Sequence, residues 1–192
     1  MSTSQIHRLV LHPCNLHDVP SSWKSIIEAL QRAEFLANAW GGGDGKRYLL
    51  GEHFVDFITF MGCSPYIALE PPEDGSLDFC HVHFSDIFAE VQFRCASHNV
   101  FARCPQCRKR IDGWGEFISR WREDPQSTRV CCDKCGANVS LYDLTWRHTA
   151  GFGRMFMDIY SVYPQEGVPT EGLLSLLEAA SGSRWGYFYT DR

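Results

Sequence analysis

Residues 104–135 read CPQCRKRIDGWGEFISRWREDPQSTRVCCDKC, a stretch that begins and ends with a Cys-x-x-Cys turn. Each turn brings two sulfur atoms close enough to share one metal ion, and two such turns supply the four thiolates of a tetrahedral zinc site. The sequence therefore predicts one zinc ion bound by Cys104, Cys107, Cys132 and Cys135. Because protein ligands would fill all four positions, we expect the metal to stabilise structure rather than to catalyse a reaction.

This ligand pattern resembles that of a zinc ribbon, over about residues 100–140 only. Gly136 follows the second pair and favours the tight backbone turn of such a site. The two pairs are 24 residues apart, whereas about 15–20 residues are typical, so we expect extra structure in the insert. Cys131 would give the less typical Cys-x-x-x-Cys spacing with Cys135 and is not expected to be a ligand. The alternatives are ordinary thiols, a redox pair or an iron–sulfur cluster.

The insert between the two pairs carries an apolar stripe. Its members recur at the i, i+3, i+4 and i+7 spacing of one helix face, and they are Trp114, Phe117, Ile118 and Trp121. One interpretation is that this face packs on the ribbon or the rest of the protein, because exposed tryptophans are costly. The other is that the stripe binds a protein partner, since Trp and Arg often anchor such interfaces.

Basic residues are concentrated around the cysteine pairs. Residues 94–135 contain nine Lys or Arg against five Asp or Glu, a net charge of +4, whereas the whole chain carries −5 and the remainder −9. Arg108, Lys109 and Arg110 form the core of this patch, which could contact nucleic-acid phosphates and which, beside the insert helix, is also expected to contact a protein partner. The alternative is that these residues offset a zinc tetrathiolate, whose charge is about −2.

The rest of the chain, residues 1–99 and 141–192, shows the alternation of strands and helices typical of an α+β body. The total length of 192 residues suits one domain with a small inserted module. Strands are predicted at 6–11, 66–69, 79–84, 87–95, 155–163 and 185–189, with 79–84 and 87–95 paired antiparallel. Helices are predicted after Ser21 or Ser22, at 52–61 and at 171–180.

The two ends of the chain resemble each other. Val19-Pro20-Ser21 and Val168-Pro169-Thr170 each precede a predicted helix, and a strand precedes each of them. Thr170 is expected to cap the last helix and Gly182 to end it. If a β-α-β unit is duplicated, the body would be ferredoxin-like, with helices on one face of a mainly antiparallel sheet. Convergence is the alternative, because Pro beside Ser or Thr is common at helix starts.

A catalytic site is the less favoured interpretation. His81 and His83 share one face of a predicted strand and could bind a second metal with His53 or His98, or act with Cys63 as base and nucleophile. Histidines on one strand face are more often surface or hydrogen-bonded groups, and a thiolate at Cys63 would be disfavoured just past a helix C-terminus.

The whole pattern predicts a cytoplasmic binding protein. Nine cysteines are an odd number, five of them in tight clusters, which fits metal-binding thiolates in a reducing compartment. We found no long apolar segment for a membrane and no secretory signal, and we expect no small-molecule substrate. We expect an adaptor that binds a protein partner, with a nucleic-acid-associated factor as the first alternative and a Cys/His or metal-dependent hydrolase as the second.

Overall fold

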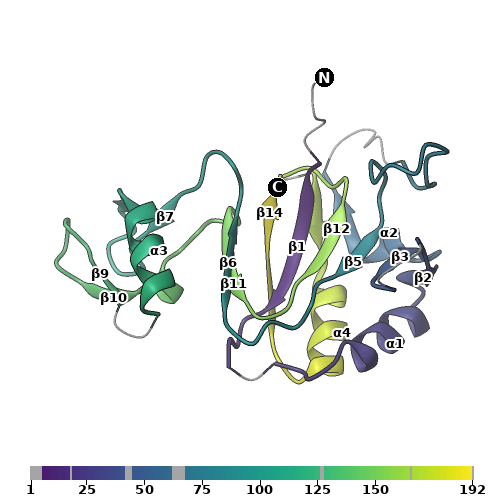
Figure 1. The fold of residues 1–192 in the computed structure, drawn as a ribbon, viewed down its shortest axis with the longest axis horizontal. Coiled ribbons are helices and arrows are strands. Elements are labelled where there is room, and N and C mark those ends of the chain that lie inside the picture. The colour runs from purple at the N-terminus through teal and green to yellow at the C-terminus, as the bar shows by residue number, and fades with distance from the viewer. Residues whose placement is uncertain are drawn as a thin grey trace.

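A six-stranded antiparallel sheet forms the body in the computed structural model, which describes residues 6–17, 19–41, 45–61, 68–125, 128–164 and 166–191 (Figure 1). The strand order is β14-β1-β12-β5-β3-β2. The strands are β1 (Arg8–Pro13), β2 (Leu36–Ala39), β3 (Arg47–Leu50), β5 (Val82–Phe84), β12 (Met157–Tyr160) and β14 (Trp185–Thr190). The predicted α+β class with a mainly antiparallel sheet is confirmed.

The sheet is built from two interleaved β-α-β units. Strands β12 and β14 run in the same direction on either side of β1, and α4 (Glu171–Ser181) connects them. In the other unit, β1 and β5 flank β12, and α1 (Lys24–Arg32) lies in their connection together with the β2–β3 hairpin. The order β14-β1-β12-β5 is that of a ferredoxin-like sheet, which the hairpin extends at one edge. Duplication of the sequence stays a prediction.

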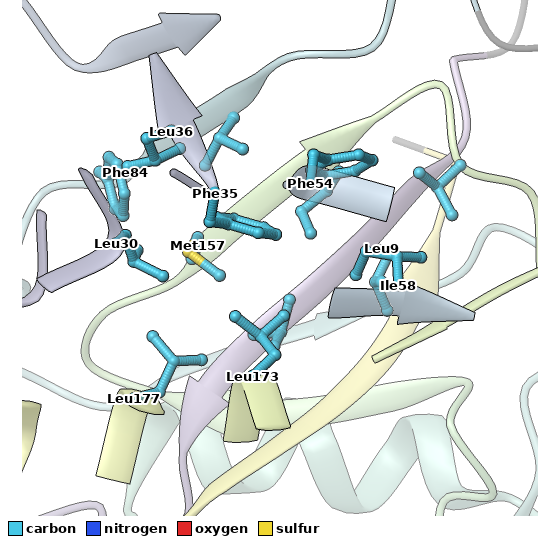
Figure 2. Close-up of a cluster of buried hydrophobic side chains, with 14 of the residues drawn as sticks. Leu9, Leu30, Phe35, Leu36, Phe54, Ile58, Phe84, Met157, Leu173 and Leu177 are labelled. Atoms are coloured by element: carbon cyan, nitrogen blue, oxygen red, sulfur yellow. The ribbon is translucent and has the colours of Figure 1, made fainter. Parts of the chain in front are cut away.

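Both long helices of the body cover one face of the sheet. Alternate residues of a strand point to opposite faces, so Leu9 and Leu11 of β1 face α1 and α4, while Val10 faces away. Figure 2 shows the resulting core, in which Leu30 of α1 and Leu177 of α4 approach the sheet. These core side chains are buried, and their removal from water is the main source of stability in the body.

The other face of the sheet carries a two-stranded arm, which we define as β6 (Gln92–Cys95) and β11 (Ala150–Gly153). The arm packs so closely that a Cβ atom added to Gly151 would lie 2.6 Å from the ring of Phe188 on β14. A partly buried ion pair also joins arm and sheet, because the guanidinium of Arg94 donates to both oxygens of Asp158 on β12, at 2.7 and 3.1 Å. The arm is therefore fixed to the body.

A small module that contains the four cysteines extends from the arm on the side away from α1 and α4 (Figure 1). Its elements are β7 (Ala102–Arg103), β8 (Arg110–Ile111), α3 (Trp114–Glu123), β9 (Arg129–Cys131), β10 (Asn138–Ser140) and the short 3₁₀ helix Leu141–Asp143. A second hydrophobic core continues past 140 to Leu144 and Trp146 and meets Phe152 of the arm. We therefore define the ribbon module as residues 100–146, slightly longer than the predicted insert.

Several local predictions hold. The helix predicted at 171–180 is α4; the Thr170 hydroxyl accepts a hydrogen bond from the Leu173 backbone N–H at 3.3 Å, and Gly182 ends the helix with φ 73°. The predicted strand at 185–189 is β14. The first helix begins differently, because its N-cap is Trp23, whose side chain makes no cap hydrogen bond.

Two expectations about the middle of the chain are wrong. Strand β5 pairs with β12 and β3, and β6 pairs with β11, so the segments predicted to pair with each other belong to different sheets. The helix predicted at 52–61 is only α2 (Phe54–Phe57), after which the chain becomes β4 (Ile58–Phe60) and pairs with β13 (Gly167–Pro169). The β-branched Ile58 and Thr59 fit this strand better than a helix. In the strand predicted at 66–69, residues 66 and 67 lie outside the described residues, and 68–69 form no strand.

None of the helices in the described part of the chain is long and apolar enough to cross a membrane.

Candidate metal centre

The four predicted ligands lie together in the ribbon module. The sulfur atoms of Cys104, Cys107, Cys132 and Cys135 are all within 4.8 Å of one another. Two of the distances join the two turns: 3.8 Å from Cys104 to Cys135 and 3.7 Å from Cys107 to Cys132. Four sulfurs placed tetrahedrally about 2.3 Å from a zinc ion would be about 3.8 Å apart. The side chains are therefore arranged to fit this ion.

Both turns use the same backbone hydrogen bonds. In each turn the residue after the second cysteine donates its N–H to the carbonyl of the first cysteine, from Arg108 to Cys104 at 2.9 Å and from Gly136 to Cys132 at 2.8 Å. The N–H of the first cysteine in turn donates to a carbonyl five residues later, that of Lys109 at 3.0 Å and that of Ala137 at 2.8 Å. These bonds hold the backbone so that the paired sulfurs point to the same place.

The repeated geometry demands a left-handed backbone after each pair. The second turn has Gly136 there, with φ 71°, and glycine adopts this conformation readily. The first turn has Arg108 with φ 61°, where a side chain makes the left-handed conformation costly. The two halves of the site therefore have the same shape, but they differ in strain.

Strand alternation separates Cys131 from Cys132. In β9 and the residue after it, Val130 and Cys132 are buried, whereas Arg129 and Cys131 are exposed. Cys131 is consequently outside the four-sulfur cluster, as its spacing predicted. Thus, a shift of one residue decides which of two adjacent thiols faces the metal position.

The protonation behaviour of the cluster also fits a metal site. The backbone N–H of Cys107 is the main cause that lowers the pKa of the Cys104 thiol to about 7. The Ala137 N–H lowers the pKa of Cys135, but burial and the neighbouring sulfurs outweigh it and raise the pKa to about 12. Four crowded thiols cannot all ionise on their own, so a divalent cation would displace protons and neutralise the resulting charge.

The apolar stripe of α3 packs mainly inside the ribbon module. Ile118 and Trp121 are buried. The indole N–H of Trp121 donates to the Tyr142 hydroxyl at 2.8 Å, and its ring meets Phe152 edge-on at 5.2 Å. Trp114 is half-buried against Trp146, with ring centroids 5.6 Å apart. This burial removes Ile118 and Trp121 from the surface that a partner could contact and leaves only parts of Trp114 and Phe117.

The predicted basic patch is on the surface. Arg108, Lys109 and Arg110 are all exposed, in and just after the first metal turn. Arg110 lies 5.0 Å above the ring of Phe101 and 3.2 Å from the Asp112 carboxylate. Because two of the three cations have no ion pair with a described residue, the patch keeps a net positive charge.

The two histidines predicted to form a catalytic or second metal site are engaged in packing and in an ion pair. His81 is fully buried, its ring stacked between Phe79 at 4.5 Å and Tyr160 at 4.2 Å, and burial lowers its pKa to about 4. His83 lies 3.7 Å from the Asp158 carboxylate, in the ion pair that joins sheet and arm. Cys63 lies outside the described residues.

The other predicted ligands of a second metal are dispersed. His53 pairs with Glu34 and Asp56 on the body, and His98 contacts Ser97. Within the described ranges, the four cysteines are the one group of three or more candidate ligands close enough to hold a metal ion. His53 and His98 are therefore exposed residues with polar partners of their own, and they do not join His81 and His83 in a second metal site.

Sequence reasoning missed a groove between the ribbon module and the arm. Arg122, Arg129 and Arg154 line it together, although they come from α3, β9 and the loop before β12. No local pattern connects residues so far apart in the chain, and only the folded arrangement shows the group.

Comparisons of the chain with family models, with curated proteins and with solved structures found no match. The function is therefore argued from the geometry and charge of the chain itself.

Proposed function

We propose that this protein is an adaptor whose zinc-bound ribbon module contacts an acidic surface on a protein partner. The exposed basic patch of Arg108, Lys109 and Arg110 carries this proposal. It lies in a module with its own core, on the side of the arm away from α1 and α4, so that a partner could reach it (Figure 1).

The metal's role in this proposal is to hold the binding surface in shape. Four cysteines would complete the coordination of zinc, and a closed site of this kind has no position for a reacting water molecule. The basic patch begins directly after Cys107, so the same turn that binds the metal also orders the patch. Loss of the metal should therefore abolish partner binding through loss of structure.

A protein partner is favoured over nucleic acid by the remaining surface of the module. Arg120 lies 4.8 Å above the half-buried ring of Phe117, which provides an apolar and cationic contact of the kind that anchors protein interfaces. The chain outside residues 94–135 carries a net charge of −9, which opposes the approach of a long polyanion. The contact would instead be confined to the ribbon module.

Nucleic acid is the second candidate, and the same basic patch supports it. Three adjacent exposed cations can contact successive phosphates without reading sequence. In that case binding should weaken steeply with salt, because each phosphate contact releases counterions.

A capture experiment with matched charge variants separates these functions. The test variant is Arg108→Asn/Lys109→Gln/Arg110→Gln, where Asn tolerates the left-handed backbone. The control, Lys24→Gln/Arg32→Gln/Arg184→Gln, removes three exposed charges from the body. Proteins retained from nuclease-treated lysate by wild type and control, but lost with the test variant, are the expected result. Capture that nuclease abolishes would favour nucleic acid, and equal capture by all three proteins would contradict a role for the patch.

A further inference from the structure

The groove between the ribbon module and the arm has the dimensions and the walls of a binding site. Its volume is about 920 Å³, within the range of about 300–1,000 Å³ that is usual for ligand sites. One wall is formed by Trp121, Arg122 and Tyr142 of the ribbon module, and the other by the chain that enters β6. The groove is distinct from the metal cluster, which none of its lining residues joins.

The backbone edge of β6 forms the second wall. Val91, Gln92 and Phe93 are consecutive residues, and all three line the groove. Since successive side chains of an extended segment point to opposite faces, a groove that is lined by three residues in a row also reaches the backbone between them. No residue of β11, the one strand that pairs with β6 in the described part of the chain, lines it. The groove therefore follows the edge away from β11 over Val91, Gln92 and Phe93 only, because further along β6 the Cys95 carbonyl accepts a hydrogen bond from the Thr190 hydroxyl of β14 at 3.0 Å.

The charges in the groove select an acidic occupant. Arg122, Arg129 and Arg154 line it, and Glu90 is the one acidic residue among the lining side chains. Arg129 is held by two hydrogen bonds to Asn138, and Arg154 by one from Nε to the Phe88 carbonyl at 2.9 Å. A guanidinium has five N–H donors, so both retain donors for an anion. Arg122 is exposed and makes no ion pair with a described residue.

We propose that this groove binds an extended acidic segment of a protein, which adds as a short strand beside residues 91–93, at the start of β6. The proposal rests on the proposed function and deepens it, because it names the part of the partner that is bound. Main-chain hydrogen bonds to β6 would give affinity, and alternate acidic side chains would reach the arginines, while the intervening side chains contact Phe93 and Tyr142.

The test uses the zinc-loaded full chain and short fluorescent peptides. The first peptide alternates glutamate and valine, and its match replaces every glutamate with glutamine. We expect the acidic peptide to bind about tenfold more tightly than the glutamine peptide. Arg122→Gln should weaken the acidic peptide about threefold to tenfold. The matched control, Arg32→Gln, removes one exposed charge from the body and should bind like wild type. Equal affinity for both peptides would overturn the proposal.

Backbone-methylated peptides test strand addition without any change to the protein. N-methyl groups on alternate residues block the donors on one edge of a strand only. N-methylation of one set of alternate residues should abolish binding. N-methylation of the other set should leave the affinity within about twofold of that of the unmethylated peptide. Equal effects of the two sets would contradict pairing with β6. If a short single-stranded oligonucleotide binds more tightly and displaces the acidic peptide, the occupant of the groove would be nucleic acid and the proposal would be wrong.

The groove and the proposed function can fail separately. If Arg122→Gln captures the same partners as wild type while the variant of the basic patch captures none, the adaptor function stands and the groove is not its site. If peptide binding depends on Arg122 but neither variant affects capture, the groove binds acidic peptides and the proposed partner contact is wrong.

Discussion

The body and the ribbon module are stabilised in different ways. In the body, a sheet of six strands and two covering helices bury a large core of Leu, Ile, Phe and Met side chains. In the ribbon module, the strands are two or three residues long, and the core combines Val, Ile and Leu side chains with Trp121, Trp146 and two of the four cysteines. Strands this short contribute little stability of their own, so we expect burial to stabilise the body and the metal to stabilise the module.

Removal of the metal should produce the largest difference between the two regions. Structural zinc contributes about 10–16 kcal/mol to the folding of small zinc-finger peptides, so its removal should change the ribbon module more than any single substitution. Chelation should therefore abolish hydrogen-exchange protection in β7–β10 and α3, while β1 and β12 stay protected. Readdition of zinc should restore the protection. Simultaneous loss of protection in β1 would show instead that body and ribbon module unfold as one unit.

Truncation of one buried side chain in each region should localise the effect. Trp121→Ala should destabilise the ribbon module by about 3–5 kcal/mol, because it leaves a cavity beside Phe152. Leu177→Ala, in α4, should cost the body about 2–5 kcal/mol. Hydrogen exchange should show the first loss mainly in α3 and the second mainly in β1 and α4. A Trp121→Ala variant with unchanged metal affinity and unchanged exchange in α3 would contradict the packing of the stripe.

The sequence predicted the elements whose signals are local. The spacing of the cysteines gave the sulfur cluster, and the cap at Thr170 and the glycine at 182 gave both ends of α4. The period of Trp114, Phe117, Ile118 and Trp121 gave α3. Each of these depends on residues within a few positions of one another or, for the metal, on a chemistry that few other residues share.

The sequence could not predict which strands pair. Alternation in 79–84 and 87–95 showed that each segment has a buried face. However, the ribbon module separates β5 from its partner β12, and β6 from its partner β11, in the sequence. The same limit applies to the stripe of α3, whose period shows a buried face without showing what covers it. The groove depends on Arg122, Arg129 and Arg154, which meet only after the arm and the ribbon module have folded.

Acid should weaken the body through two histidines whose pKa values are lowered in the folded protein. Burial lowers the pKa values of His12 and His81 from 6.5 to about 4. Between these values the unfolded chain binds protons that the folded protein does not, so the free energy of unfolding should fall as the pH decreases from about 6.5 to 4. His81→Phe preserves the aromatic stack and should reduce the slope of the free energy of unfolding against pH. This free energy is measured by denaturant unfolding at several pH values. A slope identical to that of wild type would contradict the assignment to His81.

The Asp158 carboxylate, which joins sheet and arm, should make stability depend on pH in a more acidic range. Burial alone would raise the pKa of Asp158, but His83 and the Arg94 guanidinium together lower it. Its contribution is therefore present above the unfolded value near 3.8 and is lost as the pH falls through the lower folded value. Asp158→Asn should remove this acid dependence and destabilise the contact at neutral pH, because Arg94 would be left half-buried without its partner.

The smallest effects should appear within the two metal turns. Arg108→Gly should stabilise the ribbon module by up to about 1 kcal/mol, because it relieves the left-handed backbone. Gly136→Ala should destabilise it by about 1 kcal/mol through conformation alone, since a Cβ there meets no atom within 4 Å. The double variant should be close to wild type in zinc affinity, measured by competition with a chelator. If Arg108→Gly and Gly136→Ala change the stability of the ribbon module equally and in the same direction, the two turns are not equivalent.

The adjacent thiols Cys131 and Cys132 allow the most direct test of the central claim, that four specific cysteines hold zinc. Each is replaced singly by serine, and the zinc content of the purified protein is measured by elemental analysis. Wild type and Cys131→Ser should each contain about one zinc per chain, while Cys132→Ser should lose it on mild chelation. Full retention by Cys132→Ser, or loss from Cys131→Ser, would contradict the assignment of the site.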